Sequence, residues 1–149
     1  MFAIKTVFSE NDLQQALDIR SKVFVDEQGI PRKMEVDGHD ENAWHVLVRS
    51  NGLAVATGRL LMDDGGAGNL SRIAVLPPFR SMGLGKMVIG ELEKLAEEQG
   101  AAQLYIYPHS YLENFYTCLG YHKVPGNYEV GNHRLIRMEK SLGQPIPHD

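Results

Sequence analysis

A segment with two glycines between two basic residues has the residue types needed to bind phosphate groups. It reads Arg80-Ser81-Met82-Gly83-Leu84-Gly85-Lys86 and lies between a strand-like run and a helix-like run. The first turn of a helix has unpaired N–H groups and a partial positive charge, so it can hold phosphate oxygens. Arg80 and Lys86 would add charge-assisted contacts. The alternative is a glycine-rich connection between a strand and a helix that binds no ligand.

Two common phosphate-binding motifs do not fit this segment. A Walker A loop needs Ser or Thr after Lys86, where Met87 stands, and a glycine five residues before Gly85. A dinucleotide-binding fingerprint needs Gly or Ala at the position of Val88. The segment therefore indicates another class of phosphate site.

The sequence has one cysteine, Cys118, so no intramolecular disulfide can form. No Cys/His cluster has the spacing of a structural zinc site, and we expect no metal. Cys118 stands near the end of a predicted helix, where the helix dipole disfavours a thiolate. We therefore interpret this side chain as structural rather than nucleophilic.

The elements that must position the glycine segment follow the order βα(loop)βββαβαββ in a single domain, residues 1–142. Asn51-Gly52 predicts a hairpin turn, and Ser9 with Asp12 predicts a helix cap. The strands are expected near 2–8, 44–49, 53–62, 69–76, 104–107, 121–124 and 133–140, and the helices from Ser9 to before Gly29, over 84–99, and from a cap at Ser110 and Glu113 to Gly120. Pro125-Gly126 predicts the last turn, and residues 143–149 a flexible tail.

Composition excludes several classes of protein. The 149 residues carry a formal net charge of −4, which argues against a nucleic-acid partner. No apolar run approaches the roughly 18 residues of a membrane span, and the first five residues do not resemble a signal peptide. We expect a cytoplasmic protein with no membrane partner.

Three segments resemble one protein family, the GNAT superfamily of acyl-CoA N-acyltransferases. Arg80-x-x-Gly83-x-Gly85 matches its R-x-x-G-x-G motif, and the preceding run 72–77 is similar to its fourth strand. Residues 114–121, Asn-Phe-Tyr-Thr-Cys-Leu-Gly-Tyr, resemble its F-Y-x-x-x-G-[FY] segment. Residues 23–31 resemble a small bacterial ElaA-like subgroup. Together the similar segments cover residues 20–140.

The resemblance implies an α/β (mixed α+β) GNAT fold. Its mostly antiparallel, twisted sheet of about seven strands is flanked by helices, and its parallel fourth and fifth strands splay apart. Acetyl-CoA would lie in that gap as cosubstrate, with the backbone of Ile73, Ala74 and Val75 on the pantetheine arm. The phosphates would be held by Arg80, Ser81, Met82, Gly83, Leu84, Gly85 and Lys86. Asn114 would either bond the cofactor or face solvent.

The implied reaction is transfer of an acetyl group to a primary amine of a small molecule or peptide by direct attack in a ternary complex. It needs an acid near the sulfur and a base for the ammonium. Tyr116 occupies the family's tyrosine position and is the expected acid; alternatively it belongs to the core. His109 is the expected base, although the family often has Asn or Gln there; alternatively it is a loop histidine bonded to backbone. Weaker candidates for the base are Glu27, Glu35, His39 and His45.

Other functions stay open at this stage. The fold would also suit an acyl-homoserine-lactone-synthase-like acyltransferase or a CoA-binding sensor without activity. A homodimer is possible. The acidic residues within 35–41 form either a solvated loop or a wall of the acceptor site that favours a cationic amine.

Overall fold

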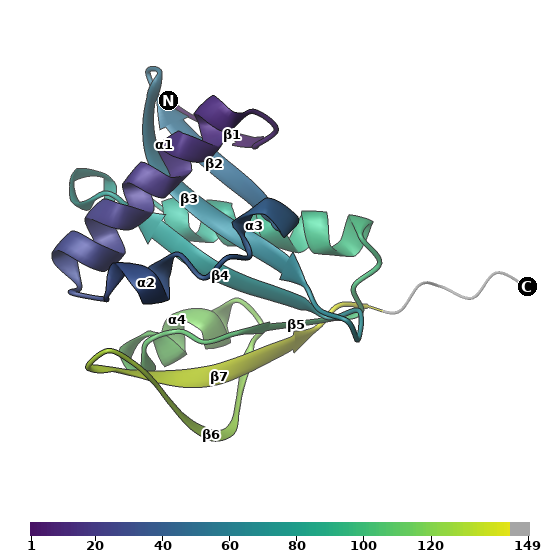
Figure 1. The fold of residues 1–149 in the computed structure, drawn as a ribbon. Coiled ribbons are helices and arrows are strands. Elements are labelled where there is room, and N and C mark those ends of the chain that lie inside the picture. The colour runs from purple at the N-terminus through teal and green to yellow at the C-terminus, as the bar shows by residue number, and fades with distance from the viewer. Residues whose placement is uncertain (144–149) are drawn as a thin grey trace, which may run out of the picture.

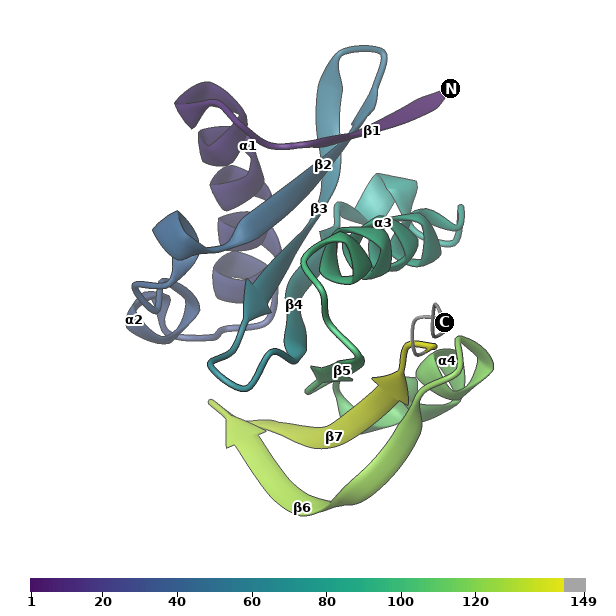
Figure 2. The same ribbon diagram turned by 90° about the vertical axis from the view of Figure 1, so that its right-hand side faces the viewer.

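The computed structural model describes residues 1–143; residues 144–149 of the expected tail lie outside the described part. One mixed sheet has α1 and α2 on one face and α3 and α4 on the other (Figure 1, Figure 2). The strands are β1 (Phe2–Thr6), β2 (Trp44–Ser50), β3 (Leu53–Met62), β4 (Gly68–Val75), β5 (Gln103–Ile106), β6 (His122–Val130) and β7 (His133–Ser141). The helices are α1 (Glu10–Arg20), α2 (Arg32–Glu35), α3 (Leu84–Glu98) and α4 (Glu113–Cys118), with a π-helical segment η1 (Ser21–Glu27) and the 3-10 turns η2 (Asp40–Asn42), η3 (Pro77–Phe79) and η4 (Ser110–Leu112).

The sheet has seven strands in the order β1-β2-β3-β4-β5-β7-β6. Neighbouring strands are antiparallel except β4 and β5, which are parallel. The parallel pairing covers only Gly68–Leu70 against Leu104–Ile106, and beyond it the two strands separate. The predicted α/β fold with a splayed parallel pair is confirmed.

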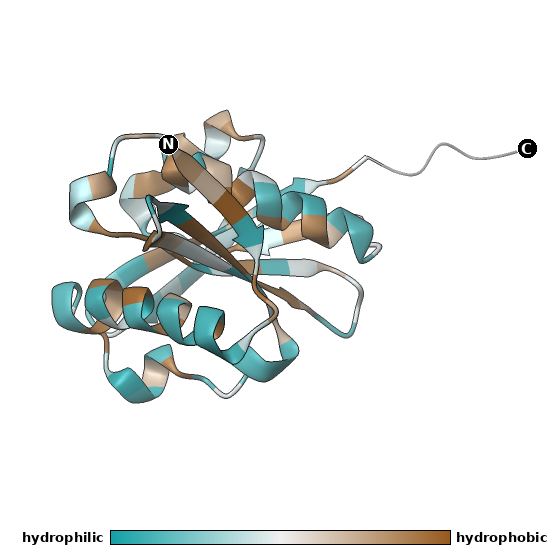
Figure 3. Ribbon diagram, turned by 90° about the horizontal axis from the view of Figure 1, so that it is seen from above, coloured by the Kyte–Doolittle hydropathy of each residue, from teal (hydrophilic) through white to brown (hydrophobic). Residues whose placement is uncertain are grey.

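Alternating side chains of the central strands fill two cores. Val46 and Val48 of β2 pack toward α3 together with Val88 and Leu92. Leu47, between the two valines, packs toward Ala16 and other buried residues of α1. The central strands are the most apolar part of the chain, and the helices are polar on their outer sides (Figure 3). Both helix layers are thereby fixed against the strands that border the parallel pair.

Two local predictions from the N-terminal half are confirmed. The Asp12 amide donates to Ser9 Oγ at 3.1 Å, as expected of a helix cap. Asn51 and Gly52 join β2 to β3 with positive φ angles of 50° and 82°. These are short-range signals, so the sequence was sufficient to find them.

The cap predicted at Ser110 is wrong. Ser110 begins the 3-10 turn η4, in which the Leu112 amide donates to the His109 carbonyl at 2.9 Å. α4 then starts at Glu113 without a side-chain cap. The 3-10 turn thereby gives the Leu112 amide an acceptor, which a side-chain cap would otherwise have provided.

The position of the last turn is also wrong. Pro125-Gly126 lies within β6, at a shift of register between Val124 and Tyr128, and Gly131-Asn132 connects β6 to β7. β6 is an edge strand, where a proline without an N–H interrupts few ladder bonds. The final hairpin is therefore longer than the sequence predicted, and its tip lies close to the cleft described next.

Candidate active site

A cleft of about 770 Å³ opens where β4 and β5 separate. Ser71, Arg72 and Ile73 of β4 line one side, and Tyr107, Pro108 and His109 after β5 line the other. The 28–39 segment and the β6–β7 hairpin form further walls. The cleft therefore joins the part of the sheet near the glycine segment to the loop before β2.

The backbone of β4 beside the cleft has no strand partner on its β5 side. On the other side, Ala74 pairs with Thr57 of β3, whereas the register shifts before Ser71 pairs with Arg59. Arg72 has a φ of 56° at this bulge, which is unusual for a residue with a Cβ. The predicted pantetheine residues Ile73, Ala74 and Val75 follow the bulge, on the free edge of the strand.

The glycine segment presents a row of unpaired amides. The N–H groups from Ser81 to Lys86 have no hydrogen-bond acceptor within residues 1–143, and α3 starts at Leu84 without a side-chain cap. Ser81 and Gly83 have positive φ angles of 65° and 80°, which turn successive N–H groups toward a common side. This set of donors fits a pyrophosphate chemically.

The guanidinium of Arg80 is held by protein groups. It forms two hydrogen bonds of 2.7 Å with the carboxylate of Glu27 in η1, and its Nε donates to the Val75 carbonyl at 2.9 Å. The Arg80 guanidinium lowers the pKa of Glu27, which therefore stays ionised at neutral pH. Glu27 was a candidate base in the sequence; here it is the counter-ion of Arg80.

Tyr116 lies at the cleft with its ring buried. The residue is 4% exposed and its ring packs edge-on against Phe115 and Tyr121. Its hydroxyl has no hydrogen-bond partner in the described residues, whereas the Tyr121 hydroxyl donates to Glu93 at 2.7 Å. Burial raises the pKa of Tyr116, so the phenol stays protonated at neutral pH. Both readings of Tyr116 hold in part: the ring packs in the core and the residue lines the cleft.

His109, in the segment between β5 and η4, also lines the cleft. Its ring stacks on Tyr111, with 5.1 Å between ring centres, and its Nε2 lies 3.2 Å from Nδ1 of His133. Burial and the neighbouring His133 lower the pKa of His109, so its imidazole is neutral at neutral pH. The alternative reading of a loop histidine bonded to backbone does not describe this ring, whose hydrogen bond is to a second histidine.

Asn114 and Cys118 lie outside the cleft. Both are exposed residues of α4, one in its first turn and one at its end. The described residues contain no group of three or more His, Cys, Asp or Glu side chains arranged to hold a metal ion. Within the same residues, no helix is long and apolar enough to cross a membrane.

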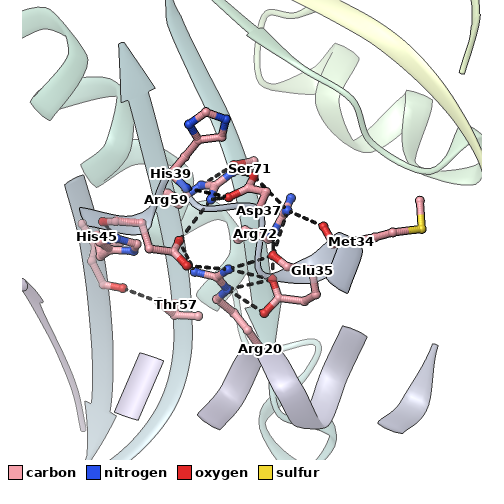
Figure 4. A network of polar contacts seen from close by, with 12 residues as sticks. Arg20, Met34, Glu35, Asp37, His39, His45, Thr57, Arg59, Ser71 and Arg72 are labelled. Carbon is pink, nitrogen blue, oxygen red and sulfur yellow. Dashed lines mark hydrogen bonds and ion pairs between the residues drawn. The ribbon is translucent and has the colours of Figure 1, made fainter. Parts of the chain in front are cut away.

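The acidic segment before β2 is bound to the sheet by arginines (Figure 4). Glu35 is 4% exposed and accepts from Arg20, 2.6 Å away, and from Arg72 at 2.9 Å. Arg59 and Arg72 donate to Asp37, and Arg20 and Arg59 donate to Asp40. The alternative of a merely solvated loop therefore does not describe Glu35 and Asp40, which are buried or half-buried, whereas Asp37 is exposed although it pairs with Arg59 and Arg72.

The three acids and the three arginines of this network carry equal and opposite charges. Glu35 and Asp37 line the cleft, as one interpretation of the sequence required. The negative charges of these two acids and of Asp40 are offset by three guanidinium groups, of which those of Arg20 and Arg59 are 0% and 4% exposed. His39 lines the cleft at an exposed position, whereas His45 is buried and bonds the Asp40 carbonyl at 2.9 Å.

The sequence model of the Acetyltransferase (GNAT) domain matches residues 6–142 of this chain. The chain belongs to the GNAT acetyltransferase family. Among GNAT relatives, the uncharacterized N-acetyltransferase YjcF of Bacillus subtilis is 32% identical over 147 residues, which cover 97% of this chain and 96% of YjcF. The resemblance stated from the motifs is confirmed.

Solved GNAT structures share the fold. Escherichia coli ElaA superposes with a TM-score of 0.84 at 25% identity, covering 95% of this chain and all of ElaA. An acyl-CoA N-acyltransferase from Pseudomonas aeruginosa superposes with a TM-score of 0.85 at 24% identity, over 95% and 100% of the two chains. The likeness to the ElaA-like subgroup therefore extends from the segment at 23–31 to the whole fold.

Proposed function

We propose that this GNAT protein transfers the acetyl group of acetyl-CoA to a primary amine of a small molecule or peptide. The observation that carries the proposal is the row of unpaired amides from Ser81 to Lys86, beside a cleft lined by Tyr116 and His109. A pyrophosphate bound to those amides would leave the free edge of β4 for the amide groups of the pantetheine arm. The Pseudomonas aeruginosa protein with the same fold is an acyl-CoA N-acyltransferase, which is consistent with an acyl-CoA donor.

In the proposed reaction His109 acts as the base and Tyr116 as the acid. Acetyl-CoA supplies a thioester carbonyl, which the amine attacks once it is neutral. His109, neutral because its pKa is lowered, accepts the proton that the ammonium must lose. As the C–N bond forms and the C–S bond breaks, the Tyr116 hydroxyl donates to the sulfur. The amine nitrogen then gives its second proton to the Tyr116 oxygen, which restores the phenol. His109 releases its proton to solvent, so each amide formed is accompanied by one free proton.

The environment of Tyr116 suits donation to a developing thiolate. A hydroxyl with a raised pKa remains protonated at neutral pH and has no competing acceptor in the described residues. A thiolate in the same buried site also has a raised proton affinity, because burial disfavours its charge. Both effects favour a hydrogen bond from oxygen to sulfur as the bond to carbon breaks.

A mass-spectrometric screen tests the proposal. The purified protein is incubated with acetyl-CoA and a panel of cationic, neutral and carboxylate-bearing primary amines, and acetylated products are identified by their mass. Mass detection is preferred to a thiol reagent because Cys118 is exposed and would react with it. We expect acetylation of at least one class, with calorimetric binding of acetyl-CoA. Binding with no product across the panel would favour a CoA sensor, and absence of binding would contradict both functions.

A further inference from the structure

A second histidine connects the candidate base to the opposite wall of the cleft. Nε2 of His109 lies 3.2 Å from Nδ1 of His133, at the start of β7, and Nε2 of His133 lies 2.7 Å from the carbonyl oxygen of Gln28. A bridge between His109 and Leu135 and the bond from the Ile136 amide to the Pro108 carbonyl hold the two histidine-bearing segments together. The three groups form a continuous chain from the end of β5 to the segment after η1.

With both rings neutral, the hydrogen-bond partners fix which ring nitrogens carry protons. A carbonyl oxygen only accepts, so Nε2 of His133 must donate to Gln28. A neutral imidazole has one N–H, which leaves Nδ1 of His133 as an acceptor. Nε2 of His109 must then be the donor in the bond between the rings. Neutral His109 is therefore protonated at Nε2 and has its lone pair on Nδ1.

We propose that His133 is a positioning residue, which holds His109 in the tautomer whose Nδ1 accepts the proton of the amine substrate. This inference rests on the proposed function, in which His109 is the base. Without His133, a neutral imidazole can place its proton on either nitrogen, and the fraction with a bare Nδ1 falls. The bond to Gln28 gives His133 its own fixed tautomer, so the orientation of the base depends on a backbone group at the far side of the cleft.

The hydrogen bonds from His109 to His133 and on to Gln28 also limit how many protons the two histidines can hold. If both rings were protonated, two N–H groups would face each other across 3.2 Å, so the pair holds at most one added proton in this arrangement. His109 can take up a proton at Nδ1 while its Nε2–H keeps its acceptor. The other titratable side chains that line the cleft or stack on His109 are Tyr107, Tyr111, Tyr116, Tyr128, Glu129, Glu35, Asp37, His39, Arg59 and Arg72.

The tautomer of His109 can be measured without turnover. In protein labelled with ¹⁵N-histidine, long-range ¹H–¹⁵N spectra distinguish a bare ring nitrogen from a protonated one. In the wild-type protein near neutral pH we expect a bare Nδ1 on both His109 and His133. A His109 signal with a protonated Nδ1 and a bare Nε2 would overturn the inference, even if the protein acetylates no amine in the panel.

Two substitutions of His133 separate positioning from folding. His133→Phe keeps a ring but removes the acceptor, and we expect mixed His109 tautomers and a kcat lower by about 2- to 10-fold, because a mixed population still contains the tautomer with a bare Nδ1. His133→Asn provides an amide oxygen that can accept from His109, and we expect it to keep the tautomer and most of kcat. Both variants should keep the wild-type KM for acetyl-CoA.

The outcomes are distinguishable from failure of the proposed function. Wild-type kcat in His133→Phe, with a folded protein by its thermal melt, would overturn the positioning role. Equal losses in His133→Phe and His133→Asn, with the His109 tautomer unchanged, would also overturn it. If His109→Asn acetylates amines at the wild-type rate, the assignment of His109 as base fails, while the tautomer measurement still decides whether His133 orients it.

Discussion

The carboxylate of Glu27 holds both terminal nitrogens of Arg80 at 2.7 Å, which connects η1 to the first residue of the R-x-x-G-x-G motif. The two side chains are about equally exposed, at 40% and 41%. An exposed pair of this kind contributes less than about 1 kcal/mol to the free energy of unfolding. It does cancel the charge of Arg80, so the net positive groups at the loop are Lys86 and the backbone amides.

Glu27→Gln should therefore strengthen binding of the anionic donor. Removing the carboxylate frees the Arg80 guanidinium, and we expect a KM for acetyl-CoA lower by about two- to fivefold at low salt, with kcat unchanged. Steady-state kinetics at two salt concentrations check this. Asp26→Asn, the same change of charge at the neighbouring exposed position, is the matched control. A KM for Glu27→Gln that equals the control or exceeds the wild-type value would show that Glu27 orients Arg80 instead.

Tyr116 of α4 and Tyr121 after it, whose rings pack edge-on, should respond to loss of the hydroxyl in opposite ways. Tyr116→Phe removes a hydroxyl with no partner among the described residues, so we expect unchanged stability and a kcat lower by about 10²-fold or more. Tyr121→Phe removes the bond to Glu93 and should cost about 1–3 kcal/mol of stability with kcat retained. Thermal melts and single-substrate kinetics measure both effects. A Tyr116→Phe enzyme with the parent kcat would exclude Tyr116 as the acid.

The glycines of the loop are needed for different reasons. Gly83 has a φ of 80°, so Gly83→Ala should cost about 1–2 kcal/mol of stability. Gly85 has ordinary helical geometry and room for a methyl group, 3.7 Å from Phe115 Cζ, so Gly85→Ala should keep or raise stability. Both should raise the KM for acetyl-CoA, because an added methyl group obstructs the approach to the amides.

Gly90→Ala is the control for this pair of variants. Gly90 lies on the exposed side of α3 with nothing within 4 Å of an added Cβ. The substitution should stabilise the helix by up to about 1 kcal/mol and leave the KM for acetyl-CoA unchanged. If Gly85→Ala behaves like Gly90→Ala in both measurements, Gly85 has no role in binding the donor.

The order of elements and the position of the glycine loop between β4 and α3 could be predicted from the sequence, because both depend on short segments. The ion-pair network joins residues 15 to 37 positions apart, so no local pattern could pair them. One signal was present: Arg20 stands on the apolar face of the first helix, and an arginine there needs a buried partner. A regular helix continuing from Ala16 and Arg20 would bury position 24 on the same face, but in the π-helical segment η1 Val23 is buried and Phe24 is only half-buried. His133 lies beside His109 because β7 pairs with β5 and its extension, and no local sequence pattern predicts that pairing.

Arg20→Met tests whether the network fixes the acidic loop. Arg20 is fully buried and donates to Glu35 and Asp40, so its loss leaves two carboxylates short of a partner. We expect a loss of about 3–5 kcal/mol in the free energy of unfolding, measured with urea. Arg49→Met is the control, since Arg49 bonds Asp12 at a more exposed site and its loss should cost less. Equal effects would contradict a special role for the buried pair.

His45 should make stability depend on pH above the range in which the acids titrate. Burial lowers the pKa of His45 in the folded protein, so below about pH 6.5 the unfolded chain binds a proton that the folded chain does not. Stability is then full above that pH and falls as pH decreases, by at most about 1.4 kcal/mol per pH unit for one group.

Asp37 and Asp40 contribute in a separate, more acidic range. The pKa of each is lowered by arginines, although burial opposes this, so their stabilisation is present above about pH 4 and is lost as pH falls further. Urea unfolding from about pH 2 to pH 8 should show both ranges. His45→Gln should reduce the pH dependence of the free energy of unfolding in the upper range and leave the lower range unchanged.

Because His109 also has a lowered pKa, His109→Asn should remove its own share of the pH dependence in the upper range, and the double variant should remove both shares. An upper slope that persists in the double variant would contradict this assignment.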